Sequence, residues 1–301
     1  MPKPADHRRT DPPPRPYRWT LSGYGGGRPD RIGELPEPPP HAGDGSVGEG
    51  YLDALVDCTA KVLARAAGGD PCFFGRSLDG MYDLLSGALE QSGWGGRIDR
   101  IPLSAGNDAC WTRAERMRFR EHLAAAGLSP YALARRKRSI ALVDVVDSGS
   151  TFSVVHGQLR AWIEESREPW PVIRRNLRYV GVTPRGKPSP NHSRWHQDLD
   201  WVRTLPADHV VSVSMHGCVW REMADHEPKL TGWFPSWRWL DADQLPGVVR
   251  HRNVAPALTR ARALVDAGRT REVRAELVRL MARDPGFAQR EVRALAGALR
   301  G

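Results

Sequence analysis

The order of apolar segments is the feature that most limits the folds open to this chain. Between residues 51 and 220, short runs rich in Val, Ile and Phe alternate with longer stretches whose apolar residues recur every three or four positions. The first pattern is typical of buried strands and the second of amphipathic helices. Strands that alternate with helices form a parallel sheet, so we predict an α/β fold. The expected strands are 71–77, 96–104, 140–146, 177–184 and 209–220.

The two ends of the chain have a different character. Residues 1–50 are rich in proline and glycine, which predicts a disordered or loosely docked arm. Residues 51–250 would form the α/β domain, and residues 251–301 an appended module of about three helices. This tail holds 11 basic and 5 acidic residues, so it carries most of the formal net charge of +9. We favour a solvated helix face, with nucleic-acid binding through the basic tail as the alternative.

Composition narrows the class of protein further. The four cysteines include no CxxC pair, which argues against a zinc site and a dense disulfide framework. No apolar run approaches the roughly 18 to 20 residues of a membrane span, and no signal peptide is evident. We therefore expect a cytoplasmic protein with no membrane partner.

One stretch, "IALVDVVDSGST" at 140–151, carries the clearest chemistry. It predicts a buried strand whose carboxyl end, where open parallel sheets bind ligands, runs into a loop of small residues. Gly149 can adopt a positive φ, and Ser148, Ser150 and Thr151 supply hydroxyl donors. The helix expected next would point free N–H groups at the same place, which suits a phosphate.

Two carboxylates belong to this stretch. Asp144 and Asp147 lie three residues apart, so they could flank a sugar attached to the phosphate. One suits the hydroxyls of the sugar and the other suits the role of proton acceptor. The alternative is structural: a strand followed by a helix capped by a hydroxyl or carboxylate side chain.

The stretch "ALVDVVDSGST" resembles the phosphoribosyl-pyrophosphate signature of type I phosphoribosyltransferases. In that family a strand ends in two acidic residues, followed by two apolar residues and a small-residue loop. The resemblance implies that Asp144 is the second acid, which contacts the ribose and magnesium, and that Asp147 is the acid of the loop. Residues 148–151 would hold the 5-phosphate. Val143 stands in place of the first acid, so one contact to ribose or magnesium is missing.

A second segment, "CFFGRSLDGMYDLL", has the form of the loop that holds pyrophosphate in this family. The resemblance implies that Gly75, Arg76 and Ser77 line that group and that Arg76 stabilises its departure. A surface ion pair is the alternative role for Arg76. The resemblance covers about 51–220.

Members of the family share a parallel sheet topped by a variable hood that selects the nucleophile. Here the hood would come from residues around 186–240, which hold six of the eleven tryptophans. Aromatic faces can stack on a planar acceptor, although packing is the commoner role of tryptophan. The candidates for acceptor binding are Trp195, His216 and Trp220.

The resemblance implies an enzyme that transfers the 5-phosphoribosyl group of phosphoribosyl pyrophosphate, with magnesium, to an unidentified small-molecule acceptor. Bacterial stress responses or specialised metabolism are settings in which such an acceptor could occur, and the chain could form a homodimer. The main alternative is a non-catalytic sensor of phosphoribosyl pyrophosphate or nucleotides. A phosphate loop of the actin-like sugar kinase fold fits less well, because that loop joins two antiparallel strands near the N-terminus.

Overall fold

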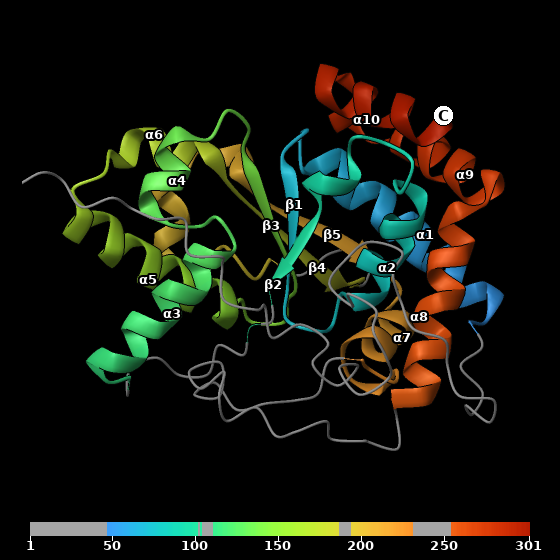
Figure 1. Ribbon diagram of the computed structural model, residues 1–301, viewed down its shortest axis with the longest axis horizontal. Helices are drawn as coiled ribbons and strands as arrows, with labels where there is room; N and C mark the ends of the chain where they lie inside the picture. Colours follow the sequence, from blue (N-terminus) through green and yellow to red (C-terminus); the bar gives the residue numbers. More distant parts are fainter. Residues whose placement is uncertain (1–46, 102, 104–110, 187–193, 231–253) are drawn as a thin grey trace, which may run out of the picture.

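A single sheet of five parallel strands forms the centre of the protein, which is seen in a computed structural model (Figure 1). The structure describes residues 47–101, 103, 111–186, 194–230 and 254–301. The strand order is β2-β1-β3-β4-β5, so the predicted α/β class and parallel sheet are confirmed. The strands are β1 (Asp70–Phe74), β2 (Asp99–Ile101), β3 (Ile140–Val145), β4 (Leu177–Pro184) and β5 (Val210–Met215).

Helices cover both faces of this sheet (Figure 1). One face carries α3 (Arg113–Ala125), α4 (Pro130–Arg135), α5 (Ser150–Ser166) and α6 (Trp170–Asn176). The other face carries α1 (Glu49–Arg65), α2 (Asp79–Ala88), α8 (Val254–Arg269), α9 (Arg271–Met281) and α10 (Arg290–Arg300). A short helix, α7 (Gly217–Arg221), follows β5 and continues into one π-helical turn, Glu222–His226.

This double cover explains why the strands are apolar almost throughout. In β3, Leu142 packs into the core of the α5 face, whereas its neighbour Val143 packs into the core of the α1 face. Every residue of 140–144 is buried. A polar side chain within this strand therefore loses contact with water, and this applies to Asp144.

Local signals in the sequence set the ends of several helices. Thr112 and Glu115 form a reciprocal capping box at the start of α3. Ser129 caps α4 by accepting a hydrogen bond from the N–H of Ala132, with Pro130 in the first helical position. The helix α1 begins at Glu49, so the predicted arm of 1–50 overlaps it; residues 1–46 lie outside the described part of the chain.

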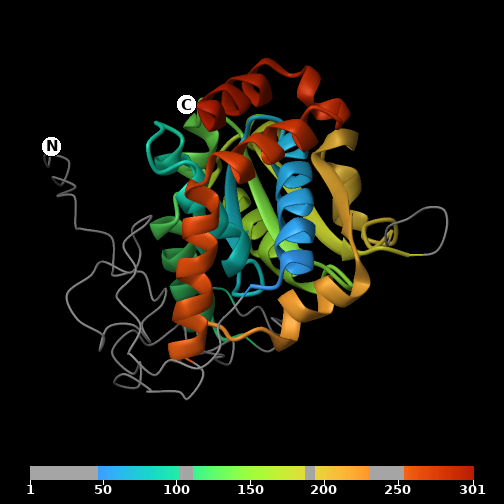
Figure 2. The same ribbon diagram turned by 90° about the vertical axis from the view of Figure 1, so that its right-hand side faces the viewer.

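The three C-terminal helices, predicted as an appended module, contribute to the apolar cluster on the α1 face of the sheet. Leu264, Leu277 and Leu299 belong to the same buried cluster as residues of α1 and α2. Figure 2 shows α8, α9 and α10 beside α1 on this face. The helix α8 packs on α2 and α9 packs on α1, so the apolar faces of the C-terminal helices cover residues of these two helices that would otherwise meet water. The boundary predicted at 250 itself falls outside the described residues.

Among the helices that the structure describes, none combines the length and apolar character that crossing a membrane requires.

Candidate functional site

The strand order creates a switch point between β1 and β3. The chain leaves β1 toward β2 on one side and later returns to add β3 on the other side, with Phe73 paired to Val143. In open α/β sheets, ligands bind in the crevice outside the carboxyl ends of the strands at such a point. The loops that leave these two strands, 75–78 and 146–149, contain both segments that the sequence indicated for phosphate chemistry.

The loop after β3 opens onto a hollow. Residues 144–152 line a space of about 160 Å³, and Asp147, Ser148 and Ser150 are exposed there. Asp147 forms no hydrogen bond or ion pair with any described residue. Its carboxylate is therefore available to a ligand, as its predicted role as catalytic base requires.

The helix α5 begins at this hollow without a side-chain cap. Its N-cap residue is Gly149, with φ 81° and ψ 14° in the left-handed region, which has no side chain to cap the N–H groups of the first turn. The alternative predicted from the sequence, a helix capped by a hydroxyl or carboxylate side chain, is therefore not observed at α5. The hydroxyls of Ser148, Ser150 and Thr151 lie near this turn but do not cap it. The N–H groups of the first turn and the positive end of the helix dipole face the loop, where an anion would be stabilised.

Asp144 lies beneath the loop and is bonded to it. Its carboxylate accepts a hydrogen bond from the N–H of Val145 at 2.8 Å, and the Thr151 hydroxyl donates another. Burial raises the pKa of this carboxyl to about 8, although those two hydrogen bonds act in the opposite direction. The side chain is therefore mostly neutral at pH 7 and does not repel an incoming phosphate. Its predicted contacts to ribose and magnesium stay predictions.

The loop after β1 brings Gly75, Arg76 and Ser77 to the switch point, and its first residue is bonded to β2. Gly75 has φ 66°, and its N–H donates to the carbonyl of Ile101 at 2.9 Å. Arg76 is half-buried; burial lowers the pKa of its guanidinium, while the carboxylates of Asp79 and Asp225 act in the opposite direction. An arginine stays charged at neutral pH, so this loop brings one cation to the switch point. Ser77 is partly buried in the same loop.

The residues predicted for acceptor binding come from the segments that follow the last two strands: Trp195 comes after β4, and His216 and Trp220 come after β5. His216 is exposed directly after β5, where its Nδ1 accepts a bond from the N–H of Cys218 at 3.3 Å. Trp220 is partly buried, and its indole N–H donates to the carbonyl of Val182 at 2.9 Å. Trp195 is 7% exposed and belongs to the core of the α5 face. The structure therefore gives both tryptophans packing roles; contact with an acceptor stays a prediction.

Gly181 and Ser212, which the sequence analysis did not single out, complete this region. Asp144 pairs with Gly181, which pairs with Ser212, so the three form one row across β3, β4 and β5. The ring of Trp195 lies over Gly181, and its N–H donates to Ser212 Oγ at 3.1 Å. The glycine in "RYVGVTP" was the available signal, because glycine inside a buried strand marks a close approach.

Within the ranges the structure describes, no three His, Cys, Asp or Glu side chains gather as a metal site. Asp147 is the one exposed carboxylate in the hollow after β3. A single carboxylate is too few ligands to hold magnesium by itself. It fits a magnesium ion that is already bound to the phosphates of a ligand.

Comparison with known proteins adds no family to these observations. No family, curated protein or solved structure matches the chain.

Proposed function

We propose that the protein binds phosphoribosyl pyrophosphate at the switch point and transfers its 5-phosphoribosyl group to a small-molecule acceptor. The observation that carries the proposal is the uncapped first turn of α5 behind Gly149, which is in the left-handed region, next to a hollow of about 160 Å³. A 5-phosphate in this hollow would accept hydrogen bonds from backbone N–H groups that have no side-chain cap. The hydroxyls of Ser148 and Ser150 are exposed at the same place.

The second half of the proposal concerns pyrophosphate. The loop Gly75–Arg76–Ser77 leaves β1, the strand paired with β3, so its cation would lie across the switch point from the 5-phosphate. In the proposed reaction the acceptor forms a bond to the anomeric carbon, and the bond from that carbon to pyrophosphate breaks. The electron pair leaves with pyrophosphate, whose charge Arg76 would stabilise. Magnesium bound to the pyrophosphate would neutralise part of the same charge.

Asp147 has the environment that a proton acceptor needs. Its carboxylate is exposed beside the hollow and has no partner among the described residues. It would take the proton that the acceptor loses as the new bond forms. Asp144 would support the site from below by holding Thr151 and by staying neutral near the phosphate.

Pyrophosphate release tests this proposal. The purified protein, supplied with phosphoribosyl pyrophosphate, magnesium and a panel of nitrogen, oxygen and carbon nucleophiles, should release pyrophosphate with at least one of them. Asp147→Asn should lower that rate by about 100-fold to 10,000-fold, the usual reach of general base catalysis. Asp53→Asn, an exposed aspartate on α1, is the matched control and should turn over normally.

A non-catalytic sensor is the second candidate, and one observation favours it. Val143, which stands in place of the first acid, is fully buried in the core of the α1 face. The strand end therefore offers the ribose one carboxyl where the family has two. Tight binding of phosphoribosyl pyrophosphate without pyrophosphate release from any acceptor would identify the sensor.

A further inference from the structure

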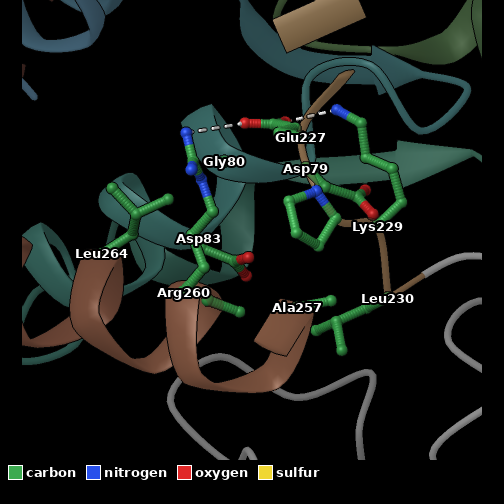
Figure 3. A pocket seen from close by; sticks show the side chains of 11 residues that line it. Asp79, Gly80, Asp83, Glu227, Lys229, Leu230, Ala257, Arg260 and Leu264 are labelled. Atoms are coloured by element: carbon green, nitrogen blue, oxygen red, sulfur yellow. Dashed lines mark hydrogen bonds and ion pairs between the residues drawn. The ribbon is translucent and has the colours of Figure 1, made fainter. Parts of the chain in front are cut away.

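A buried ionic cluster joins α1, α8 and the segment after the π-helical turn, and Figure 3 shows Arg260 and Lys229 bonded to Glu227 within it. At its centre is Glu227, which follows the π-helical turn and is 5% exposed. The hydroxyl of Tyr51, on α1, donates to Glu227 Oε2 at 2.5 Å. Arg260, on α8, lies with Nη2 at 3.4 Å from the same oxygen, and the ammonium of Lys229 bonds to Oε1.

Lys229 extends this cluster to the loop. Its Nζ donates to the carbonyl of Ser77 at 3.3 Å and to the carbonyl of Met223 at 2.5 Å, besides its bond to Glu227. The lysine side chain is only 6% exposed. All three ammonium donors are therefore directed at protein oxygens, and one of them holds Ser77, the last residue of the loop.

Backbone hydrogen bonds hold the other two residues of the loop. The N–H of Gly75 donates to the Ile101 carbonyl at 2.9 Å, and the N–H of Asp79 donates to the Arg76 carbonyl at 3.2 Å. Hydrogen bonds from a charged group in a buried setting are stronger than neutral ones. Lys229 therefore gives the carbonyl of Ser77 a charge-assisted hydrogen bond from outside the loop.

We propose that Lys229, held by Glu227, is a positioning residue that fixes the loop Gly75–Ser77 and so aims Arg76 at the pyrophosphate subsite. The inference about the loop stands on the contacts alone, and its consequence for pyrophosphate rests on the proposed function. The same cluster links the loop to α1 through Tyr51 and to α8 through Arg260.

The first experiment measures the loop without any ligand. Amide hydrogen exchange is followed in the full chain for Gly75 and Asp79, and for Val146, whose N–H donates to the Val182 carbonyl in the sheet. Lys229→Met should raise exchange at Gly75 and Asp79 by about 10-fold or more relative to Val146. Normalising to Val146 separates local loosening from a general loss of stability.

Two further variants keep this experiment decisive. Lys61→Met is the matched control, because it removes a lysine that pairs with Asp57 on α1 and does not contact the loop. It should leave the exchange ratios unchanged. If Lys229→Met does not fold, Lys229→Gln gives the same readout with a shorter neutral side chain. Unchanged exchange ratios in the folded Lys229 variant would overturn the proposal.

The second experiment separates this proposal from the function it rests on. Inorganic pyrophosphate with magnesium and ribose 5-phosphate are titrated into the wild type and the Lys229 variant. Binding of pyrophosphate should weaken by about 10-fold in the variant, whereas binding of ribose 5-phosphate, at the loop 147–151, should not change. Equal weakening of both ligands, or of neither, would contradict a role in aiming Arg76. If the wild type binds neither ligand while the loop is still loosened in the variant, the proposed function is rejected. The contact between Lys229 and Ser77 would still be shown to fix the loop.

Discussion

The indole ring of Trp195 lies so close to the backbone of Gly149 that a β-carbon there would come within 2.5 Å of the ring carbon Cε3. The same ring covers Gly181, where a β-carbon would lie 2.7 Å from the indole nitrogen. That nitrogen donates its hydrogen to Ser212 Oγ at 3.1 Å. The start of α5 is therefore held by a ring fixed on two neighbouring strands, and only glycine fits at either contact.

Replacing Gly149 with alanine should destabilise the fold. The residue has φ 81°, where an alanine costs roughly 1 to 3 kcal/mol, and overpacking against Trp195 adds a similar amount. Urea unfolding should therefore show a loss of about 2 kcal/mol or more. Gly157→Ala, on the same helix with no atom near its added β-carbon, should instead gain about 0.5 to 1 kcal/mol. Equal effects from the two variants would show that Trp195 does not constrain this turn.

Asp144→Asn should change how stability depends on pH. The folded carboxyl has a pKa of about 8, above its ordinary value of 3.8, so the folded state keeps a proton that the unfolded state loses between about pH 4 and pH 8. In the wild type, the free energy of unfolding contributed by this group therefore falls as pH rises through that window. The asparagine variant lacks this fall.

Urea unfolding at pH 5 and pH 8.5 measures this difference. Relative to the wild type, Asp144→Asn should gain at least about 1 kcal/mol between the two pH values, since one pKa unit corresponds to about 1.4 kcal/mol. Asp53→Asn, on the exposed side of α1, should run parallel to the wild type. A parallel curve for Asp144→Asn as well would mean that the carboxyl is ionised in the folded protein.

Gly268→Ala should weaken the contact between α2 and α8. A β-carbon at this position would lie 2.1 Å from the carbonyl oxygen of Leu84, so the two helices would have to separate. We expect a loss of about 1 to 3 kcal/mol in the free energy of unfolding. Gly297→Ala, on α10 with open space around it, is the control and should not destabilise. An unchanged free energy of unfolding in Gly268→Ala would mean that α8 does not pack on α2 as closely as described.

Arg76→Ala should affect pyrophosphate chemistry far more than stability. The side chain is half-buried and its charge is close to the carboxylates of Asp79 and Asp225, so its loss should cost less than about 1 kcal/mol of stability. Removal of a group that stabilises developing charge commonly lowers turnover by about 100-fold or more. Pyrophosphate release measured beside Arg203→Ala, whose side chain is exposed, provides the comparison. Normal turnover by Arg76→Ala would remove this arginine from the mechanism.

The sheet and the loop after β3 were predictable because their causes are local. Runs of β-branched residues mark strands that are buried on both faces, and a glycine among small polar residues marks a turn with positive φ. The observed left-handed Gly149 and the helix start at Ser150 follow from such signals.

The row from Asp144 through Gly181 to Ser212 was not predictable, because it depends on the register between strands that are far apart in the sequence. The contact of Lys229 with Ser77 joins residues 152 positions apart, and no short pattern encodes it. The C-terminal helices show a related limit. Their periodicity indicates an apolar face, but it does not say which surface that face covers.

Calorimetric titration of phosphoribosyl pyrophosphate with magnesium into the full chain measures whether the loop after β3 binds this ligand. We expect saturable binding at one site per chain, with affinity lost in Gly149→Ala and largely retained in Asp147→Asn. Folding of each protein is checked by circular dichroism in the same buffer. If the folded wild type binds neither phosphoribosyl pyrophosphate nor any ribose 5-phosphate compound, the loop after β3 is not a phosphate site and the proposed function is wrong.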